Sequence, residues 1–178
     1  MGQSVLLEAK GGSSSSGTSG IGSLGGGGGG DRSWASGPIV GVGIRFRRSE
    51  RVALEAMIEY SSHKRTQEEW QSPLVNDPRL TRLELTGLVR WSWSLFRPTY
   101  FIVFLGPVLT FQKIDEVVVQ TRVAQYTTSG KENMHLGLVF GIGLEGRVAD
   151  RWELSVEGGL RIRSYVASTL QLGIAYTL

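Results

Sequence analysis

The sequence contains no cysteine and only two histidines among its 178 residues. Without cysteine, the chain has neither a disulfide framework nor a thiolate metal site. Two histidines and the lack of a carboxylate cluster argue against a metal enzyme, and we expect no metal site and no cofactor. No stretch approaches the roughly 18 consecutive apolar residues that a membrane-spanning helix requires, and transmembrane helices are therefore excluded.

The excess of positive over negative charge is also small. The net charge is only +3, and 15 of the 19 basic residues are arginines spread along the chain. No basic stripe or recognition motif accompanies them, so we expect no nucleic-acid partner. The planar guanidinium suits forked contacts with carboxylates. The chain opens on polar sequence without an apolar signal segment, so we expect a start from which any export signal is missing.

What the chain does have is alternation. From residue 170 to residue 178 every second residue is apolar, and the residues between them are Gln171, Gly173, Ala175 and Thr177. Successive side chains of a strand point to opposite faces, so this segment has one apolar face and one small or polar face. The pattern is typical of a strand with lipid outside and a filled lumen inside.

The same alternation recurs along the chain in seven further segments. The eight segments are 5–10, 39–47, 52–63, 83–95, 100–112, 134–147, 152–163 and 170–178. Most are close to the length of about 9–11 residues that a tilted strand needs to cross a bilayer. The sequence therefore predicts an all-β fold: an eight-stranded antiparallel up-and-down transmembrane β-barrel that forms a single domain over residues 1–178.

The connections alternate between long and tight. The long ones, at about 13–36, 64–79 and 113–131, fit external loops, and an even strand count places both termini on the periplasmic side. Residues 11–30 are rich in glycine and serine and predict a mobile loop, with a linker between two domains as the alternative. Residues 117–126 predict either a hairpin beyond the membrane or an extra crossing strand.

Aromatic residues gather near the tight turns on the apolar face. This position is typical of a girdle at the membrane interface. The expected members are Phe46, Trp91, Trp93, Tyr100, Trp152 and Tyr176.

Segment 100–112 is apolar on both faces, so alternation alone does not tell which face is outside. We expect Tyr100 to face lipid, and this sets the expected orientation of the segment. Ile102, Phe104, Val108 and Thr110 would then face lipid, and Phe101, Val103, Leu105, Leu109 and Phe111 would face inward. The inward side chains would fill space left by glycines of other strands, with a hydrophobic ligand slot as the alternative. Pro107 cannot donate a ladder hydrogen bond, which predicts a bulge or a local break.

Charged residues fall on the inward phase in equal numbers of each sign. They are Arg45, Arg47, Glu55, Glu59, Glu84, Arg90, Glu145, Arg147, Glu153, Glu157, Arg161 and Arg163. Buried charges are tolerated when they are paired and hydrogen-bonded, so we predict ion pairs across the lumen that brace the barrel. A transport or catalytic role is the alternative. Side chains can fill an eight-stranded barrel, which argues against a general diffusion pore.

His63 and His135 are weak candidates for catalysis. Both lie near the long-loop end on the inward phase, with serines and carboxylates nearby, as nucleophilic catalysis requires. A barrel enzyme that modifies lipid A is therefore one alternative function. A second alternative is a water-soluble lipocalin-like carrier with the apolar face turned inward. The scarcity of lysine on the polar face argues against such a carrier.

Three features resemble a known family: the run Gly137-Leu-Val-Phe-Gly-Ile-Gly143, the Gly106-Pro107 pair and the closing segment 170–178. They are similar to the Bacteroidota-type outer-membrane β-barrel domain, also called PorT-like, over about residues 3–178. The resemblance implies export, assembly by the barrel-insertion machinery and a porin-like or secretion-associated role. We expect a structural anchor or surface-interaction protein of the bacterial outer membrane. Its expected partners are the bilayer, lipopolysaccharide and a protein bound through the external loops.

Overall fold

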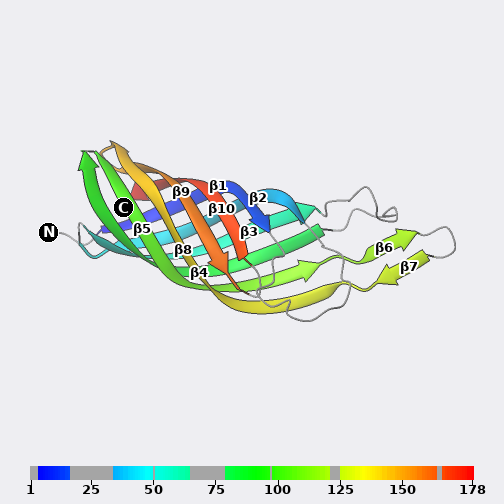
Figure 1. The fold of residues 1–178 in the computed structure, drawn as a ribbon. Helices are drawn as coiled ribbons and strands as arrows, with labels where there is room; N and C mark the ends of the chain where they lie inside the picture. Colours follow the sequence, from blue (N-terminus) through cyan, green and yellow to red (C-terminus); the bar gives the residue numbers. More distant parts are fainter. Residues whose placement is uncertain are drawn as a thin grey trace.

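The computed structural model describes residues 4–16, 34–49, 51–64, 79–96, 98–120, 125–163 and 166–178. Figure 1 shows the strands β1 (Ser4–Ser16), β2 (Trp34–Arg47), β3 (Val52–Lys64), β4 (Arg79–Phe96), β5 (Thr99–Ile114), β6 (Val117–Gln120), β7 (Gln125–Thr128), β8 (Lys131–Ala149), β9 (Trp152–Ile162) and β10 (Val166–Thr177). Eight of them close into an antiparallel barrel in the order β1-β10-β9-β8-β5-β4-β3-β2. The predicted fold class is confirmed. Among the described residues, no helix has the length and apolarity needed to cross a membrane.

The two ends of the barrel differ. The start of β1 and the end of β10 lie at the end of the barrel where tight turns join β2 to β3, β4 to β5 and β8 to β9 (Figure 1). The opposite end carries the β6–β7 hairpin, which projects beyond the barrel. Because β6 pairs with β7 in a separate two-stranded sheet, residues 117–120 and 125–126, the described part of 117–126, belong to a hairpin and do not add a crossing strand.

The apolar face of the wall points outward. Leu172 is 64% exposed and Leu136 is 75% exposed, whereas Arg45 and Arg90 are each 1% exposed. The burial pattern agrees with the predicted alternation in every barrel strand except β5. An apolar exterior around a charged interior is the reverse of a soluble carrier, so the lipocalin-like alternative is wrong.

The predicted orientation of β5 is wrong. Phe104 and Val108 are buried in the lumen, whereas Leu105 is exposed on the outside. The register gives the reason, because Tyr100 lies opposite the inward-facing Glu145 of β8. Even-numbered residues of β5 therefore face inward, and Tyr100 does not belong to the outward-facing girdle. When both faces of a strand are apolar, the pattern cannot set which one is buried.

The inner face of β5 packs against glycines. A Cβ atom at Gly141 would overlap the Phe104 ring, and one at Gly159 would lie 3.5 Å from it. The ring occupies the space that these two glycines leave. On the outer face, Phe101 contacts Trp93 with ring centroids 6.2 Å apart. The lumen-filling role predicted for Phe101 and its neighbours thus belongs to Phe104.

Further differences concern loops and the proline. Residues 13–16 and 34–36, expected in the first external loop, belong to β1 and β2. Backbone pairing needs no apolar side chain, and Ser13 pairs with Leu170 of β10. Residues 17–33 and 65–78, which make up most of two expected loops, lie outside the described residues. Near Pro107 the β4–β5 ladder skips from Val108 to Leu105 without a register shift, which is a local break and not a bulge.

Candidate functional site

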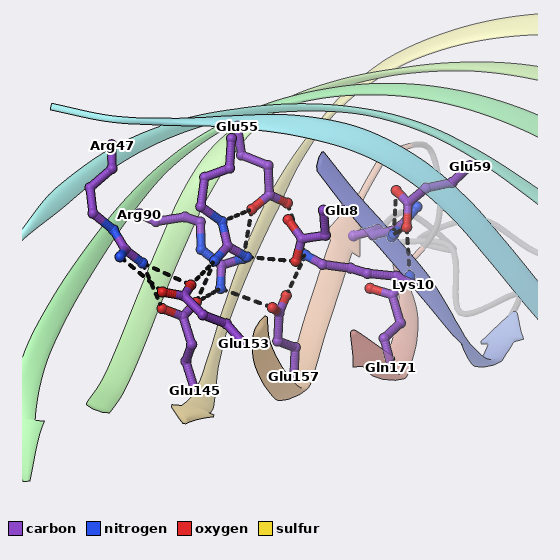
Figure 2. Close-up of polar contacts among 12 residues, drawn as sticks. Glu8, Lys10, Arg47, Glu55, Glu59, Arg90, Glu145, Glu153, Glu157 and Gln171 are labelled. Atoms are coloured by element: carbon purple, nitrogen blue, oxygen red, sulfur yellow. Dashed lines mark hydrogen bonds and ion pairs between the residues drawn. The ribbon is translucent and has the colours of Figure 1, made fainter. Parts of the chain in front are cut away.

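The candidate functional site is the charged interior of the barrel. Alternation turns every second side chain inward, and the ladder then brings charges of neighbouring strands together, as with Arg45 opposite Glu55. The larger of two groups, named here the tight-turn cluster, lies toward the tight turns. Its members are Glu8, Lys10, Arg45, Arg47, Glu55, Arg90, Glu145, Glu153 and Glu157, most of which are labelled in Figure 2.

Glu55 is the centre of the tight-turn cluster. Its carboxylate accepts hydrogen bonds from Lys10 Nζ at 2.8 Å, Arg90 Nη1 at 2.8 Å and Arg45 Nε at 3.2 Å. Lys10 and Arg90 also donate to Glu157, at 2.7 and 2.9 Å. Charge-assisted hydrogen bonds thereby join β1, β2, β3, β4 and β9 across the lumen.

Arg47 extends the cluster toward the tight turns. It donates to Glu145 and to Glu153 at 3.0 Å, and Arg45 reaches Glu145 at 2.5 Å. Arg147, predicted in the same network, lies at its margin: its side chain is 56% exposed and stands 3.7 Å from Glu153. The β8–β9 register shifts just after Arg147, where the strand ends, which explains its exposure.

A second group, named here the long-loop cluster, lies further along the lumen toward the long connections. Both oxygens of Glu59 accept from Arg161 Nη2 at 2.8 Å. Glu84 forms ion pairs with Arg161 and with Arg163, the latter at 2.5 Å. Thr110 Oγ1 donates to Glu84 at 3.4 Å. These contacts join β3, β4, β5 and β9 to the start of the following connection.

The network includes polar residues that the sequence-based prediction omits. These residues are Glu8, Lys10, Thr86 and Gln171. Glu8 and Lys10 stand two residues apart on the polar phase of the first segment, and that phase is the signal that could have identified them. Thr86 and Gln171 both donate to Glu59, at 3.2 and 2.6 Å. Uncharged donors thus complete the coordination of this buried carboxylate.

The arrangement suits bracing. Opposite charges neutralise each other inside the wall, and hydrogen bonds replace the lost water, which is the condition under which buried ions are stable. Within the described ranges, no group of three or more histidine, aspartate or glutamate side chains is placed to hold a metal ion.

The purified barrel is expected to show no large, steady conductance in a planar lipid bilayer. Side chains of the tight-turn cluster meet across the lumen at hydrogen-bond distance and interrupt the path that ions would follow. Current recording at both polarities, with an open porin as the positive control, measures this. A large, steady current would show that the lumen is open.

His63 and His135 lie on different parts of the wall. His63, on β3, is fully buried, and its Nε2 lies 3.1 Å from Ser14 Oγ and 3.3 Å from Ser61 Oγ. His135, on β8, is opposite Thr110 of β5. Because β4 and β5 stand between β3 and β8, the ladder does not place the two histidines side by side. His63 is therefore a buried imidazole within hydrogen-bond distance of two serine hydroxyls.

Aromatic side chains mark the tight-turn end of the outer face. Phe46, Trp91, Trp93, Trp152 and Tyr176 lie there. The Trp152 and Tyr176 rings pack against each other in a tilted arrangement, with centroids 4.8 Å apart. Arg151, on the turn outside the strands, donates to the Tyr176 hydroxyl at 3.1 Å, and this hydrogen bond raises the pKa of Arg151. Such a girdle is typical of a membrane–water interface.

A closed eight-stranded barrel with an apolar exterior defines the class of integral β-barrel membrane proteins. Residues 1–166 match the family described as the outer membrane protein beta-barrel domain, and the chain belongs to this family. It is therefore a small β-barrel protein of the bacterial outer membrane. No curated protein matches the sequence significantly.

Solved structures of small outer-membrane proteins share the fold. Ail, the attachment invasion locus protein of Yersinia pestis, superposes with a TM-score of 0.57 at 12% identity over 99% of each chain. The N-terminal β-barrel domain of Pseudomonas aeruginosa OprF gives 0.51 at 13% identity, over 98% of this chain and 97% of that one. Neisserial surface protein A gives 0.50 at 14% identity, over 100% and 98%. At these identities the likeness shows the fold alone.

Proposed function

We propose that this protein is a non-conducting, non-enzymatic anchor of the outer membrane that makes surface contacts through its long-loop end. One observation carries the proposal. β5 and β8 remain paired as far as Ile114 and Lys131, and the β6–β7 hairpin continues beyond them (Figure 1). Ion pairs across the lumen brace the barrel wall. Binding surfaces are commonly formed by connections that such a rigid scaffold holds in position.

In this proposal, the long-loop end faces outside and both termini lie in the periplasm, because the external connections of outer-membrane barrels are the long ones. The contact regions are the connections that follow β1, β3 and β5, at 17–33, 65–78 and 115–130, the last of which includes β6 and β7. The chain forms one domain over residues 1–178, and the barrel-insertion machinery assembles it. Its Gly106-Pro107 pair and the glycine-rich run that ends at Gly143 support a place among Bacteroidota-type, PorT-like barrels.

The described part of the contact surface contains a groove of about 410 Å³ between β4, β5 and β8. The lining residues that have the outward phase of their strands are Thr81, Leu83, Phe111, Lys113, Glu132 and Met134. Lys113 and Glu132 form an exposed ion pair at 3.5 Å. Hydroxyl, ammonium and carboxylate groups can form hydrogen bonds with sugar hydroxyls, and an aromatic ring offers an apolar face beside them. We therefore propose the sugars of lipopolysaccharide as the ligand.

One related structure supports the choice of a sugar. Ail of Yersinia pestis was solved in complex with the heparin analogue sucrose octasulfate; that structure has a TM-score of 0.53 and 13% identity to this chain, and covers 99% of each. A small barrel of this fold is thus compatible with a sugar ligand. The lining residues of the present groove, and not the likeness, carry the proposal for this protein.

Deacylated lipopolysaccharide, which keeps the sugars and lacks the acyl chains, tests the proposal. We expect it to bind the protein in phospholipid nanodiscs. The double substitution Lys113→Ala with Glu132→Ala, at two exposed side chains on the outward phase of β5 and β8, should weaken binding about five-fold or more, because each lost hydrogen bond contributes about 0.5–1.5 kcal/mol. Thr127→Ala, on the hairpin and outside the groove, is the matched control. Calorimetric titration that shows no binding, or equal binding by all variants, would contradict the proposed ligand.

A further inference from the structure

A second groove lies on the outer side of the barrel, over β2, β3, β4 and β5. Leu7 of β1 and Leu136 of β8 flank it, and its volume is about 690 Å³. Val42, Ile58 and Leu85 form part of its walls, and all three are exposed on the outer face. The groove is therefore open to whatever surrounds the barrel.

Small residues line the centre of this outer groove. Ala56 of β3 lies directly opposite Gly87 of β4. A Cβ atom at Gly87 would meet no other atom within 4 Å. Beside Gly87, the β4–β5 ladder is broken at Pro107. The depression exists because a glycine and an alanine stand side by side between branched aliphatic side chains.

We propose that the outer groove binds one acyl chain of a phospholipid. Its lining is apolar apart from Thr86, and the outer face of a membrane barrel is surrounded by hydrocarbon. Inside a bilayer, the hydrophobic effect does not favour protein over lipid, so van der Waals contacts determine what binds. A concave aliphatic site offers an acyl chain more such contacts than the convex wall around it.

The size of the groove favours an acyl chain over a protein segment. A cavity of about 150 Å³ encloses a benzene ring, so 690 Å³ has room for an extended chain. One turn of an α-helix with its side chains is about 10–12 Å wide and would take most of this volume. A spanning helix has about 20 residues and would rest mainly on the wall outside the groove.

The position of the groove favours a phospholipid over lipopolysaccharide. On one side the groove reaches the tight-turn end of the barrel, because Leu7 is three residues from the start of β1 and Ile44 is three residues from the end of β2. That end is periplasmic in the orientation proposed above, on which this choice of lipid rests. Phospholipid forms the periplasmic leaflet of the outer membrane.

Two glycine substitutions test the acyl-chain site without altering the lumen. Gly87→Leu fills the outer groove, and the open space at Gly87 accepts the new side chain. Gly158→Leu is the matched control, because Gly158 stands opposite the outward-facing Leu170 and also has nothing within 4 Å of its Cβ position. The wild-type protein and both variants are reconstituted in vesicles of phosphatidylethanolamine, one acyl chain of which bears a photoreactive diazirine. Heat-modifiable gel migration verifies folding, and mass spectrometry identifies the residues labelled after illumination.

For the wild-type protein and Gly158→Leu, we expect labelling at Ile58 and Leu85 about five-fold above that at Leu172, equivalent to about 1 kcal/mol of preference. Gly87→Leu should lower it to the level of Leu172. Uniform labelling around the wall, or unchanged labelling in Gly87→Leu, would overturn the proposal. Protein–protein cross-links at these positions would also overturn it, because a second copy would then fill the groove. The vesicles contain no lipopolysaccharide, so failure of the proposed surface function would leave this result unchanged.

Discussion

Glu55→Ala is expected to lower the free energy of unfolding by about 3–5 kcal/mol, the range for removing one partner of a buried ion pair. The Glu55 carboxylate accepts from Lys10, Arg45 and Arg90, and all four side chains are almost completely buried. Its removal leaves three cations with one counter-charge fewer in an interior that water does not solvate. Urea titration of the refolded protein in lipid vesicles, followed by heat-modifiable gel migration, measures the loss.

Ser155→Ala is the matched control for the lumen. Ser155 is buried on the same inner face, and its hydroxyl has no hydrogen-bond partner among the described residues. We expect this variant to change stability by less than about 1 kcal/mol. Glu55→Gln keeps the shape of the side chain and removes only its charge. We expect it to lower the free energy of unfolding by less than Glu55→Ala, and it can be measured even if Glu55→Ala fails to fold. Unfolding of Glu55→Gln at the wild-type urea concentration would show that the charge does not stabilise the barrel.

The composition of the network follows largely from sequence alternation. A strand residue belongs to one face or the other, and Arg45 and Glu55 meet because a short turn fixes the register of their hairpin. Alternation does not tell which charges meet across the lumen. Arg90 and Glu157 are 67 residues apart and lie on β4 and β9, strands that are not neighbours in the wall. Their contact depends on the diameter and stagger of the closed barrel, which no local pattern encodes.

Strand ends are also poorly defined by sequence. The serines at 13–16 have the composition of a loop, yet their backbones continue the β1 ladders with β10 and β2. Strand propensity describes how side chains fit a half-buried sheet, and at the rim of a barrel the pairing of the neighbours overrides it. Arg147 shows the opposite effect, because it has the inward phase of its strand but lies where the register shifts near the turn.

The orientation of β5 is the clearest failure of the sequence pattern. Tyr100 is an unreliable marker of the outer face, because it stands at the end of the strand and opposite Glu145. A better signal was present in Thr110, whose hydroxyl donates to Glu84 in the lumen. Polar side chains such as Thr110 and Gln112 on one face of an otherwise apolar strand indicate the polar side of the wall, because an unpaired polar group is unfavourable in hydrocarbon.

Phe104→Ala is expected to lower the free energy of unfolding by about 3–5 kcal/mol, and Phe101→Ala by distinctly less. The Phe104 side chain is 4% exposed and packs against Gly141 and Gly159. The guanidinium carbon of Arg90 lies 5.8 Å from the centroid of the Phe104 ring. Truncation of Phe104 leaves a cavity enclosed by the wall. The space left by Phe101 lies on the outer face, where lipid chains can fill it. Urea midpoints of the two variants measure the difference.

Gly159→Leu supplies the second arm of this test. A Cβ atom at Gly159 would lie 3.5 Å from the Phe104 ring, so a leucine overpacks the wild-type lumen, at about 1–3 kcal/mol. The same leucine should refill the cavity of Phe104→Ala, so the double variant should be more stable than Phe104→Ala alone. A double-mutant cycle gives the coupling energy. Strictly additive losses would place the ring away from Gly159, and equal losses for Phe104→Ala and Phe101→Ala would mean that the inner face of β5 is packed no more tightly than its outer face.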